Sequence, residues 1–175
     1  MQTLAGAALA PEEVPVAMDR TLAVPAAAGA ASRWTFQELC ASNVGASDYI
    51  ALVNRYHTIA LFAVPVFSGA TRSEAYRFVK LVDLMYEHRC KLLISAEGYP
   101  ADLFRNVHTV EQGRVLGAKL ADDAVVDDNI GFAKDRVESR LIEMGTIEYA
   151  IAHAERHEPR LVQALREVQA RGGPC

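Results

Sequence analysis

The chain has 175 residues, a length typical of one domain that buries about two-thirds of its unfolded surface. It is 51% hydrophobic and 23% charged, which is a globular composition, and its net charge of -4 gives no electrostatic reason to expect nucleic acid as a partner. Its apolar runs are shorter than the roughly 18 residues of a membrane span. Three cysteines without CxxC spacing predict a reducing compartment and not a disulfide framework.

The N-terminal segment is apolar but lacks the positive charge of a targeting peptide. No Lys or Arg occurs before Arg20. A secretory or mitochondrial targeting peptide is therefore not expected in the sequence as written, unless Met1 is not the start of the natural protein. We assign residues 1–13 to an extension or a disordered segment.

Alternating apolar residues between positions 14 and 24 predict a β-hairpin that turns at residues 19–20. The alanine-rich residues 25–31 are expected to form a connector. A second alternation, at Trp34 and Phe36, predicts another short strand that ends near residue 39.

A short helix and a buried strand are predicted next. Ser47 and Asp48 indicate the helix start, because a hydroxyl caps the first turn and a carboxylate suits the positive end of the helix. Residues 58–64 are almost all apolar, as expected of a strand that is buried on both faces. Pro65 lacks the amide that a central strand needs, so we expect the strand to end there.

The central unit of the chain is an amphipathic helix that leads into an apolar strand. Thr71 and Glu74 have the spacing of a capping box, and apolar residues recur at helical spacing from Phe78 to Tyr86. An apolar strand is predicted over residues 90–97. Helices and strands thus alternate, which predicts an α/β fold with helices layered on a small, mostly parallel sheet, an N-terminal β-hairpin and a long C-terminal helix.

The patterns are weaker after the central unit. Apart from one helical turn at 101–104, residues 98–131 are predicted to be an exposed insertion or loop. Its aspartates lack the spacing, the glycine and the closing glutamate of a calcium loop, so we interpret them as a solvated charge run. They are Asp122, Asp123, Asp127 and Asp128. A strong helix is predicted from Gly131, with an apolar seam that continues to Ile151, and residues 158–175 are predicted to be a terminal helix and tail.

The residues alone indicate little chemistry. The chain contains no GxxxxGK[ST], GxGxxG, GxSxG or HExxH motif. His153 and His157 share a helix face, but no third ligand is evident, so a solvated helix end is favoured over a metal site. Residues 95–97 end a predicted strand, where open α/β sheets bind ligands, although a hydrolase that uses Ser95 is disfavoured because no elbow motif surrounds it.

Arg136 and Arg140 are the sharpest candidates for a binding site. They lie one helical turn apart on a half-apolar helix. Two guanidiniums in this arrangement can clamp a phosphate, or they can pair with the nearby carboxylates of Asp135, Glu138 and Glu143. From the residues alone, the ion pairs are favoured.

An ordered series of motifs carries a resemblance to a known family over residues 14–157. The series is Trp34-Thr35-Phe36-Gln37-Glu38-Leu39-Cys40, Asp48-Tyr49, His57-Thr58, Arg77-Phe78, Tyr86, Ser95-Ala96-Glu97 and Ser139-Arg140-Leu141-Ile142-Glu143-Met144. It closely resembles the C-terminal part of the AFG-one-like AAA+ ATPases, the family of the ZapE and lactation-elevated (LACE-type) proteins.

The resemblance implies a ring-forming ATPase that uses ATP and Mg²⁺, but the Walker A and Walker B motifs of the family lie upstream of the residues present. This chain alone is therefore expected to bind neither and to be inactive. The implied partners are sibling ATPase subunits in a homo-oligomeric ring and protein clients, with possible peripheral association with the mitochondrial inner membrane. The implied roles are protein quality control in mitochondria or cell division in bacteria, and the acidic insertion favours mitochondria over the cytoplasm.

The resemblance also implies that Arg77, Arg136 and Arg140 are nucleotide-facing or finger arginines. Departures from the family pattern weaken this transfer, since Tyr76 replaces one of two paired arginines and Glu138 replaces a Thr or Ser. A second hypothesis therefore remains open. In it, the chain is a non-catalytic α/β module that binds a partner protein or a sibling subunit.

Overall fold

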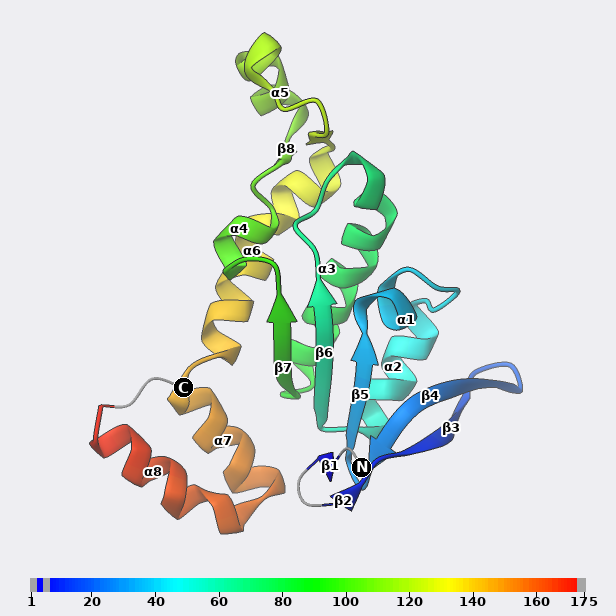
Figure 1. Cartoon of the computed structure of the whole chain (residues 1–175), viewed down its shortest axis with the longest axis vertical. Helices are drawn as coiled ribbons and strands as arrows, with labels where there is room; N and C mark the ends of the chain where they lie inside the picture. The colour runs from blue at the N-terminus through cyan, green and yellow to red at the C-terminus, as the bar shows by residue number, and fades with distance from the viewer. Residues whose placement is uncertain (1–2, 5–6, 173–175) are drawn as a thin grey trace.

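A five-stranded sheet forms the centre of the computed structural model, which describes residues 3–4 and 7–172 (Figure 1). The strand order is β3-β4-β5-β6-β7. The first three strands pair antiparallel, and β5, β6 and β7 run parallel. Their bounds are β3 Ala10–Val16, β4 Arg20–Ala28, β5 Ala31–Thr35, β6 Thr58–Val64 and β7 Lys91–Ala96.

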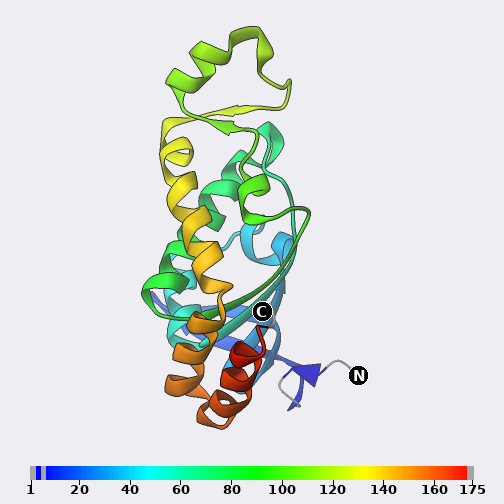
Figure 2. The same cartoon turned by 90° about the vertical axis from the view of Figure 1, so that its left-hand side faces the viewer.

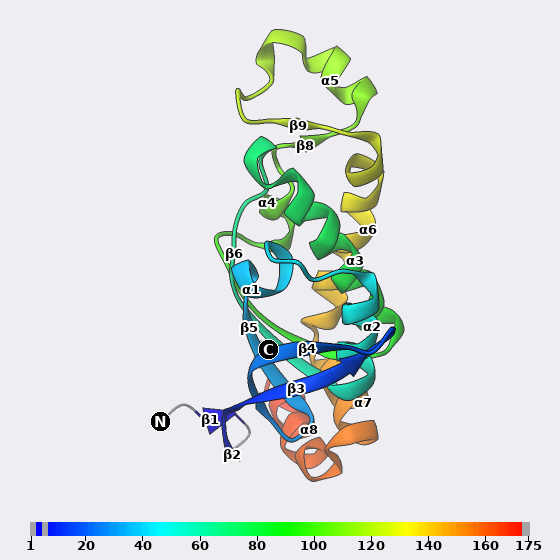
Figure 3. The same cartoon turned by 90° about the vertical axis from the view of Figure 1, so that its right-hand side faces the viewer.

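Three helices cover one face of this sheet. They are α2 (Ala46–Arg55), α3 (Arg72–Glu87) and α6 (Asp128–Met144). Figure 3 shows β5 and β6 on one side and these helices on the other, with the β3–β4 hairpin crossing beside α2. The side chains of Ile59 and Leu61 on β6 are fully buried between them. The predicted α/β fold, with its hairpin and parallel strands, is confirmed.

The N-terminal strands extend further than the patterns indicated. Residues 1–2 and 5–6 of the predicted extension 1–13 lie outside the described residues. In the described part of this extension, β1 (Thr3–Leu4) pairs with β2 (Ala7–Ala8). Strands β3 and β4 form the predicted hairpin. The connector predicted at residues 25–31 is wrong, because β4 continues to Ala28 and turns at Gly29, whose positive φ of 59° suits a glycine.

The strand predicted to end near residue 39 is also wrong. Strand β5 ends at Thr35, and helix α1 (Phe36–Cys40) begins there. The Thr35 backbone N–H donates to Glu38 Oε2 at 2.7 Å, and the Glu38 N–H donates to Thr35 Oγ1 at 3.2 Å. This reciprocal capping box satisfies two amides at the helix start, which outweighs the local alternation of apolar residues.

Two predicted helix starts have different caps from those expected. Helix α2 begins after Gly45, whose N–H donates to Asp48 at 2.8 Å, so Ser47 is not the cap. Thr71 precedes α3, but its hydroxyl accepts a hydrogen bond from the Ser68 N–H at 2.9 Å and does not cap the helix. The capping box predicted at Thr71 is therefore wrong, although the helix itself and the strand after it are confirmed.

The segment predicted as an exposed insertion, residues 98–131, contains short elements in the structure. They are α4 (Pro100–Leu103), β8 (Val107–His108), α5 (Val110–Leu116) and β9 (Val125–Val126), and β8 pairs with β9 in parallel. Several of its apolar side chains are buried, namely those of Leu103, Phe104, Val107 and Val125. The division of the chain into domains remains a prediction.

The strong helix predicted from Gly131, whose apolar seam continues to Ile151, is divided into two helices in the described structure. Helix α6 ends at Met144, and α7 (Ile147–His157) begins after Thr146, whose hydroxyl accepts a hydrogen bond from the Tyr149 N–H. Helix α8 (Val162–Ala170) then folds back beside α7 (Figure 2). Among the described residues, no helix has the length and apolarity needed to cross a membrane.

Candidate functional site

Helices α3 and α6 lie side by side in the same direction and bring two of the three predicted arginines together. Asp83 on α3 is the centre of this group. The Arg136 Nη2 donates to Asp83 Oδ2 at 2.9 Å, and Arg140 Nη1 donates to Asp83 Oδ1. One carboxylate thus holds two guanidiniums in a fork, and its hydrogen bond to Arg136 raises the pKa of that side chain.

The partners of these arginines differ from those that the sequence suggested. Arg136 and Arg140 were expected to pair with carboxylates on their own helix, but both pair with Asp83, which is more than fifty positions away. Glu143 instead accepts a hydrogen bond from the Tyr86 hydroxyl at 2.7 Å, which raises the pKa of Tyr86. The guanidinium of Arg140 lies 4.8 Å from the centre of the Tyr86 ring, so this aromatic side chain contacts both a cation and an anion.

Arg77, the third predicted arginine, does not join this group. Its Nη1 donates to the backbone carbonyl of Cys40 at the end of α1, at 2.9 Å. The side chain therefore connects α3 to α1.

A second polar group lies at the start of α6 and was missed by the sequence analysis. Asp127 was assigned to a solvated charge run, but it is buried and accepts hydrogen bonds from Tyr76 Oη at 2.7 Å and from Arg72 Nε at 3.0 Å. It also caps α6 by accepting from the Asn129 N–H at 2.9 Å. The sequence signal that was available is an aspartate directly before a strong helix.

The family of the chain is shown by its match to a family model. The model described as AFG1-like ATPase matches residues 1–118, which is about two-thirds of the chain. The chain belongs to the AFG1-like ATPase family. This match includes Arg77 but ends before Arg136 and Arg140.

Three curated proteins are similar to parts of the chain. The cell division protein ZapE of Escherichia coli is 48% identical over 63 residues, which are 36% of this chain and 17% of ZapE. An uncharacterized protein of Schizosaccharomyces pombe is 34% identical over 78 residues, 45% of this chain and 17% of that protein. The lactation elevated protein 1 homolog B of Danio rerio is 28% identical over 135 residues, 67% of this chain and 26% of that protein. The chain thus spans about a quarter or less of the length of these relatives, and no solved structure matches it significantly.

Members of an ATPase family bind ATP, and the three arginines are the residues of this chain that the family resemblance directs to a nucleotide. In this structure all three arginines have partners within the chain. Asp83 already occupies the position between Arg136 and Arg140 where a phosphate would have to lie, and Arg77 donates to a backbone carbonyl. A carboxylate there would also repel a phosphate.

Glu97 and His153, which the sequence also singled out, each have a structural partner. Glu97, after β7, accepts a hydrogen bond from the Val66 N–H at 3.1 Å, which fixes a turn. His153 is buried, and its Nε2–H donates to the His57 carbonyl at 3.0 Å, so the solvated helix end expected there is wrong. Within the described ranges, no group of three or more His, Cys, Asp or Glu side chains is arranged to hold a metal ion.

Proposed function

We propose that this chain is the C-terminal α/β part of an AFG1-like ATPase and does not hydrolyse ATP by itself. The family match carries the first half of the proposal. Two observations support the second half. The sequence lacks a GxxxxGK[ST] motif, and Arg136 and Arg140 are both paired with Asp83. A guanidinium accelerates phosphate transfer only where a phosphate loop and Mg²⁺ already hold the phosphate.

In the complete ATPase, ATP and Mg²⁺ would be bound by the part that carries the phosphate loop. We propose, on the family resemblance, that Arg77, Arg136 and Arg140 face the nucleotide in that assembly. For the α6 pair this requires that Asp83 release at least one guanidinium. We also propose that the complete ATPase forms a ring of sibling subunits and acts on protein clients. We place this ATPase in the mitochondrion, at the inner membrane, with the cytoplasm as the alternative.

The test compares two proteins. The first is this chain, and the second is the same chain joined to an upstream family segment that contains the phosphate loop. We expect ATP turnover only in the second. Replacing Asp83 with Asn in the second protein should change turnover if the α6 arginines face the nucleotide, whereas replacing the exposed Asp122 should not. Motor-like turnover by the chain alone would refute the proposal.

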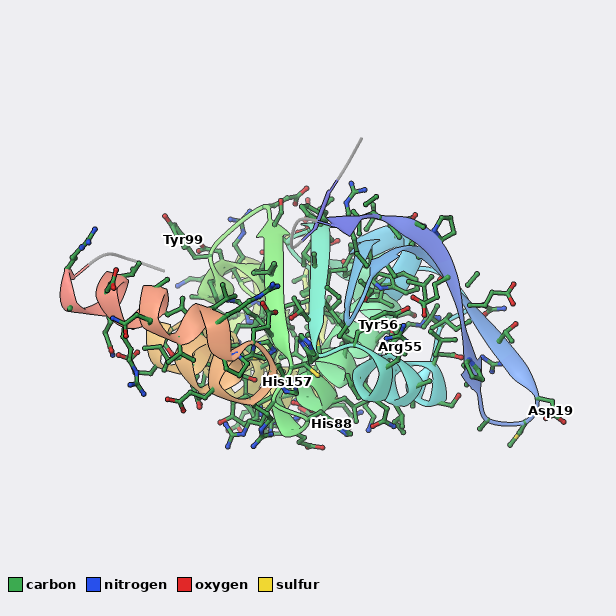
Figure 4. All side chains as sticks on the ribbon, turned by 90° about the horizontal axis from the view of Figure 1, so that it is seen from below. Asp19, Arg55, Tyr56, His88, Tyr99 and His157 are labelled. Atoms are coloured by element: carbon green, nitrogen blue, oxygen red, sulfur yellow. The ribbon has the colours of Figure 1, made fainter. Side chains whose placement is uncertain are left out.

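A second candidate function is that of a non-catalytic module that binds a partner protein, and one observation favours it. The face of β5–β7 that points away from the helices is open (Figure 4). On it, Phe62 is 37% exposed and Leu93 is 42% exposed, whereas Ile59 on the opposite face is fully buried. Parallel sheets are usually covered on both faces, so this face suits a protein partner.

Sedimentation velocity with a family ATPase such as ZapE tests this second function. We expect a complex that is weakened when Phe62 is replaced with Asp. The matched control is Ile142→Asp, which places the same charge at an exposed apolar position on α6. Equal weakening by both substitutions, or no complex at all, would count against the interaction module.

A further inference from the structure

A small pocket lies at the opposite end of the molecule from α5, between α7 and the turn that joins α3 to β7. It has a volume of about 350 Å³ and is lined by Arg89, Tyr149, Ala152, His153 and Arg156. Figure 4 labels His88 and His157, the chain neighbours of Arg89 and Arg156, near the starts of β6 and β7. The lining residues carry two guanidiniums, an imidazole and a phenol, and none of them is a carboxylate.

The two arginines of this pocket have no anionic partner in the described part of the chain. The Arg89 guanidinium lies over the ring of Tyr86, 5.5 Å from its centre, and neither Arg89 nor Arg156 forms an ion pair among the described residues. The neighbouring Arg166 on α8, by contrast, pairs with Glu155 at 2.7 Å. The pocket thus presents two exposed guanidiniums and no carboxylate among its lining residues.

The backbone holds Arg89 in place. Its φ is +56°, a left-handed conformation that is uncommon for a residue with a side chain. The turn is fixed by hydrogen bonds from the Arg89 N–H to the Tyr86 carbonyl at 3.1 Å and from the Cys90 N–H to the Met85 carbonyl at 2.9 Å. Tyr149 Oη of α7 donates to the Cys90 carbonyl at 2.9 Å, so the two walls of the pocket are tied together.

His153 is also fixed, in a way that leaves one ring nitrogen available. Its Nε2 lies 3.0 Å from the His57 carbonyl, which also accepts the Lys91 N–H at 2.7 Å. Since a carbonyl is only an acceptor, Nε2 carries the proton. Nδ1 is then an acceptor in the neutral ring and becomes a donor when the ring is protonated.

We propose that this pocket binds a small oxyanion, either inorganic phosphate or the phosphate group of a small ester. The guanidiniums of Arg89 and Arg156 supply planar donors that match phosphate oxygens, and His153 supplies a further donor when it is charged. Because hydrogen bonds already fix the backbone of both walls, binding has to order mainly the two arginine side chains. The pocket is distinct from the Asp83 group, and its failure to bind phosphate would leave the proposed ATPase function untouched.

The histidine couples this site to pH. Burial, together with the charges of His157, His57 and Lys91, lowers the pKa of His153, and burial also lowers the pKa of His157. An oxyanion in the pocket favours the protonated ring and opposes this effect, so binding is accompanied by proton uptake and strengthens as the pH falls. The charged groups around the histidines are Arg89, Lys91, Arg156 and, with the opposite sign, Glu158.

Calorimetric titration of the whole chain with inorganic phosphate tests the proposal. We expect saturable binding that weakens by about tenfold or more in Arg156→Gln, the loss expected for a charge-assisted hydrogen bond. The control is Arg114→Gln, which removes the same charge from α5 at the far end of the molecule (Figure 1). Comparison of phosphate with glycerol phosphate distinguishes the free ion from an ester.

Sulfate isolates the pH effect, because its own charge is constant over the relevant range. Its affinity should be higher at about pH 6 than at about pH 7.5, and His153→Asn should remove this difference. Arg89→Gln provides a second, exposed variant in case His153→Asn does not fold. The proposal is overturned by a lack of saturable phosphate binding or by an equal loss in Arg114→Gln. An affinity for sulfate that is independent of pH also contradicts the role of His153.

Discussion

Asp127 is expected to make a large contribution to stability. Its side chain is only 4% exposed. Burial alone would raise its pKa, but hydrogen bonds from Arg72, Tyr76 and the first amides of α6 outweigh burial and lower the pKa from 3.8 to about 2. At about 1.36 kcal/mol per pKa unit, this difference corresponds to about 2–3 kcal/mol of stability at neutral pH.

The substitution Asp127→Ala removes the charge, the cap and the acceptor for Tyr76, so we expect a loss of about 3 kcal/mol in the free energy of unfolding. Asp127→Asn keeps a capping oxygen and should cost only about 1–2 kcal/mol. Urea unfolding followed by circular dichroism at pH 7 measures both. The exposed Asp122→Asn is the matched control, with a change within about 0.5 kcal/mol.

The pH dependence gives an independent check. Because the pKa of Asp127 is lowered in the folded state, its contribution is complete above about pH 4 and is lost as the pH falls toward about 2. The wild type should therefore lose more stability over this range than Asp127→Asn. The reasoning is refuted if Asp127→Ala and Asp127→Asn lower the free energy of unfolding equally at pH 7. It is also refuted if the wild type and Asp127→Asn lose stability in parallel as the pH falls.

Three further substitutions test other contacts by urea unfolding. Asp83→Ala leaves the two α6 guanidiniums without their shared carboxylate and should cost about 1–2 kcal/mol, whereas no loss would show that the fork is not stabilising. Tyr149→Phe removes the hydrogen bond to the Cys90 carbonyl and should cost about 1 kcal/mol, with faster hydrogen exchange in α7 as the specific readout. Gly131→Ala should cost about 1–3 kcal/mol despite the better helix propensity of Ala, because its Cβ would lie 2.8 Å from the Thr109 nitrogen; a stabilised variant would contradict this contact.

The elements that were predicted correctly are those whose signal is local. Strand β6 is a continuous apolar run closed by Pro65, and α3 has an apolar face that repeats every three or four residues. Neither prediction required knowledge of what the element packs against. The parallel order of β5, β6 and β7 then follows from the helices that connect them.

The errors came where a polar group decides between two local options. At Thr35 the alternation of apolar residues continued, but a capping box with Glu38 ended the strand. At Asp127 a neighbouring run of aspartates suggested solvent, but the side chain caps α6 and meets α3. Asp83 lies on α3, and its partners Arg136 and Arg140 lie on α6, far away in the chain. The spacing of these residues in the sequence therefore does not predict their contact.

The open face of the sheet limits what kind of partner can bind there. Complete burial of a Leu or Phe is worth about 1.5–3 kcal/mol, and Leu93 and Phe62 already bury more than half of their surface, so together they have only about 1–2 kcal/mol left to contribute. A stable complex has a far larger interface, of about 1,200–2,000 Å². A partner must therefore also cover Tyr99, which is 81% exposed and projects on the open side, and the unpaired edge of β7 (Figure 4). This requirement favours a folded protein surface over a short peptide as the occupant of the face.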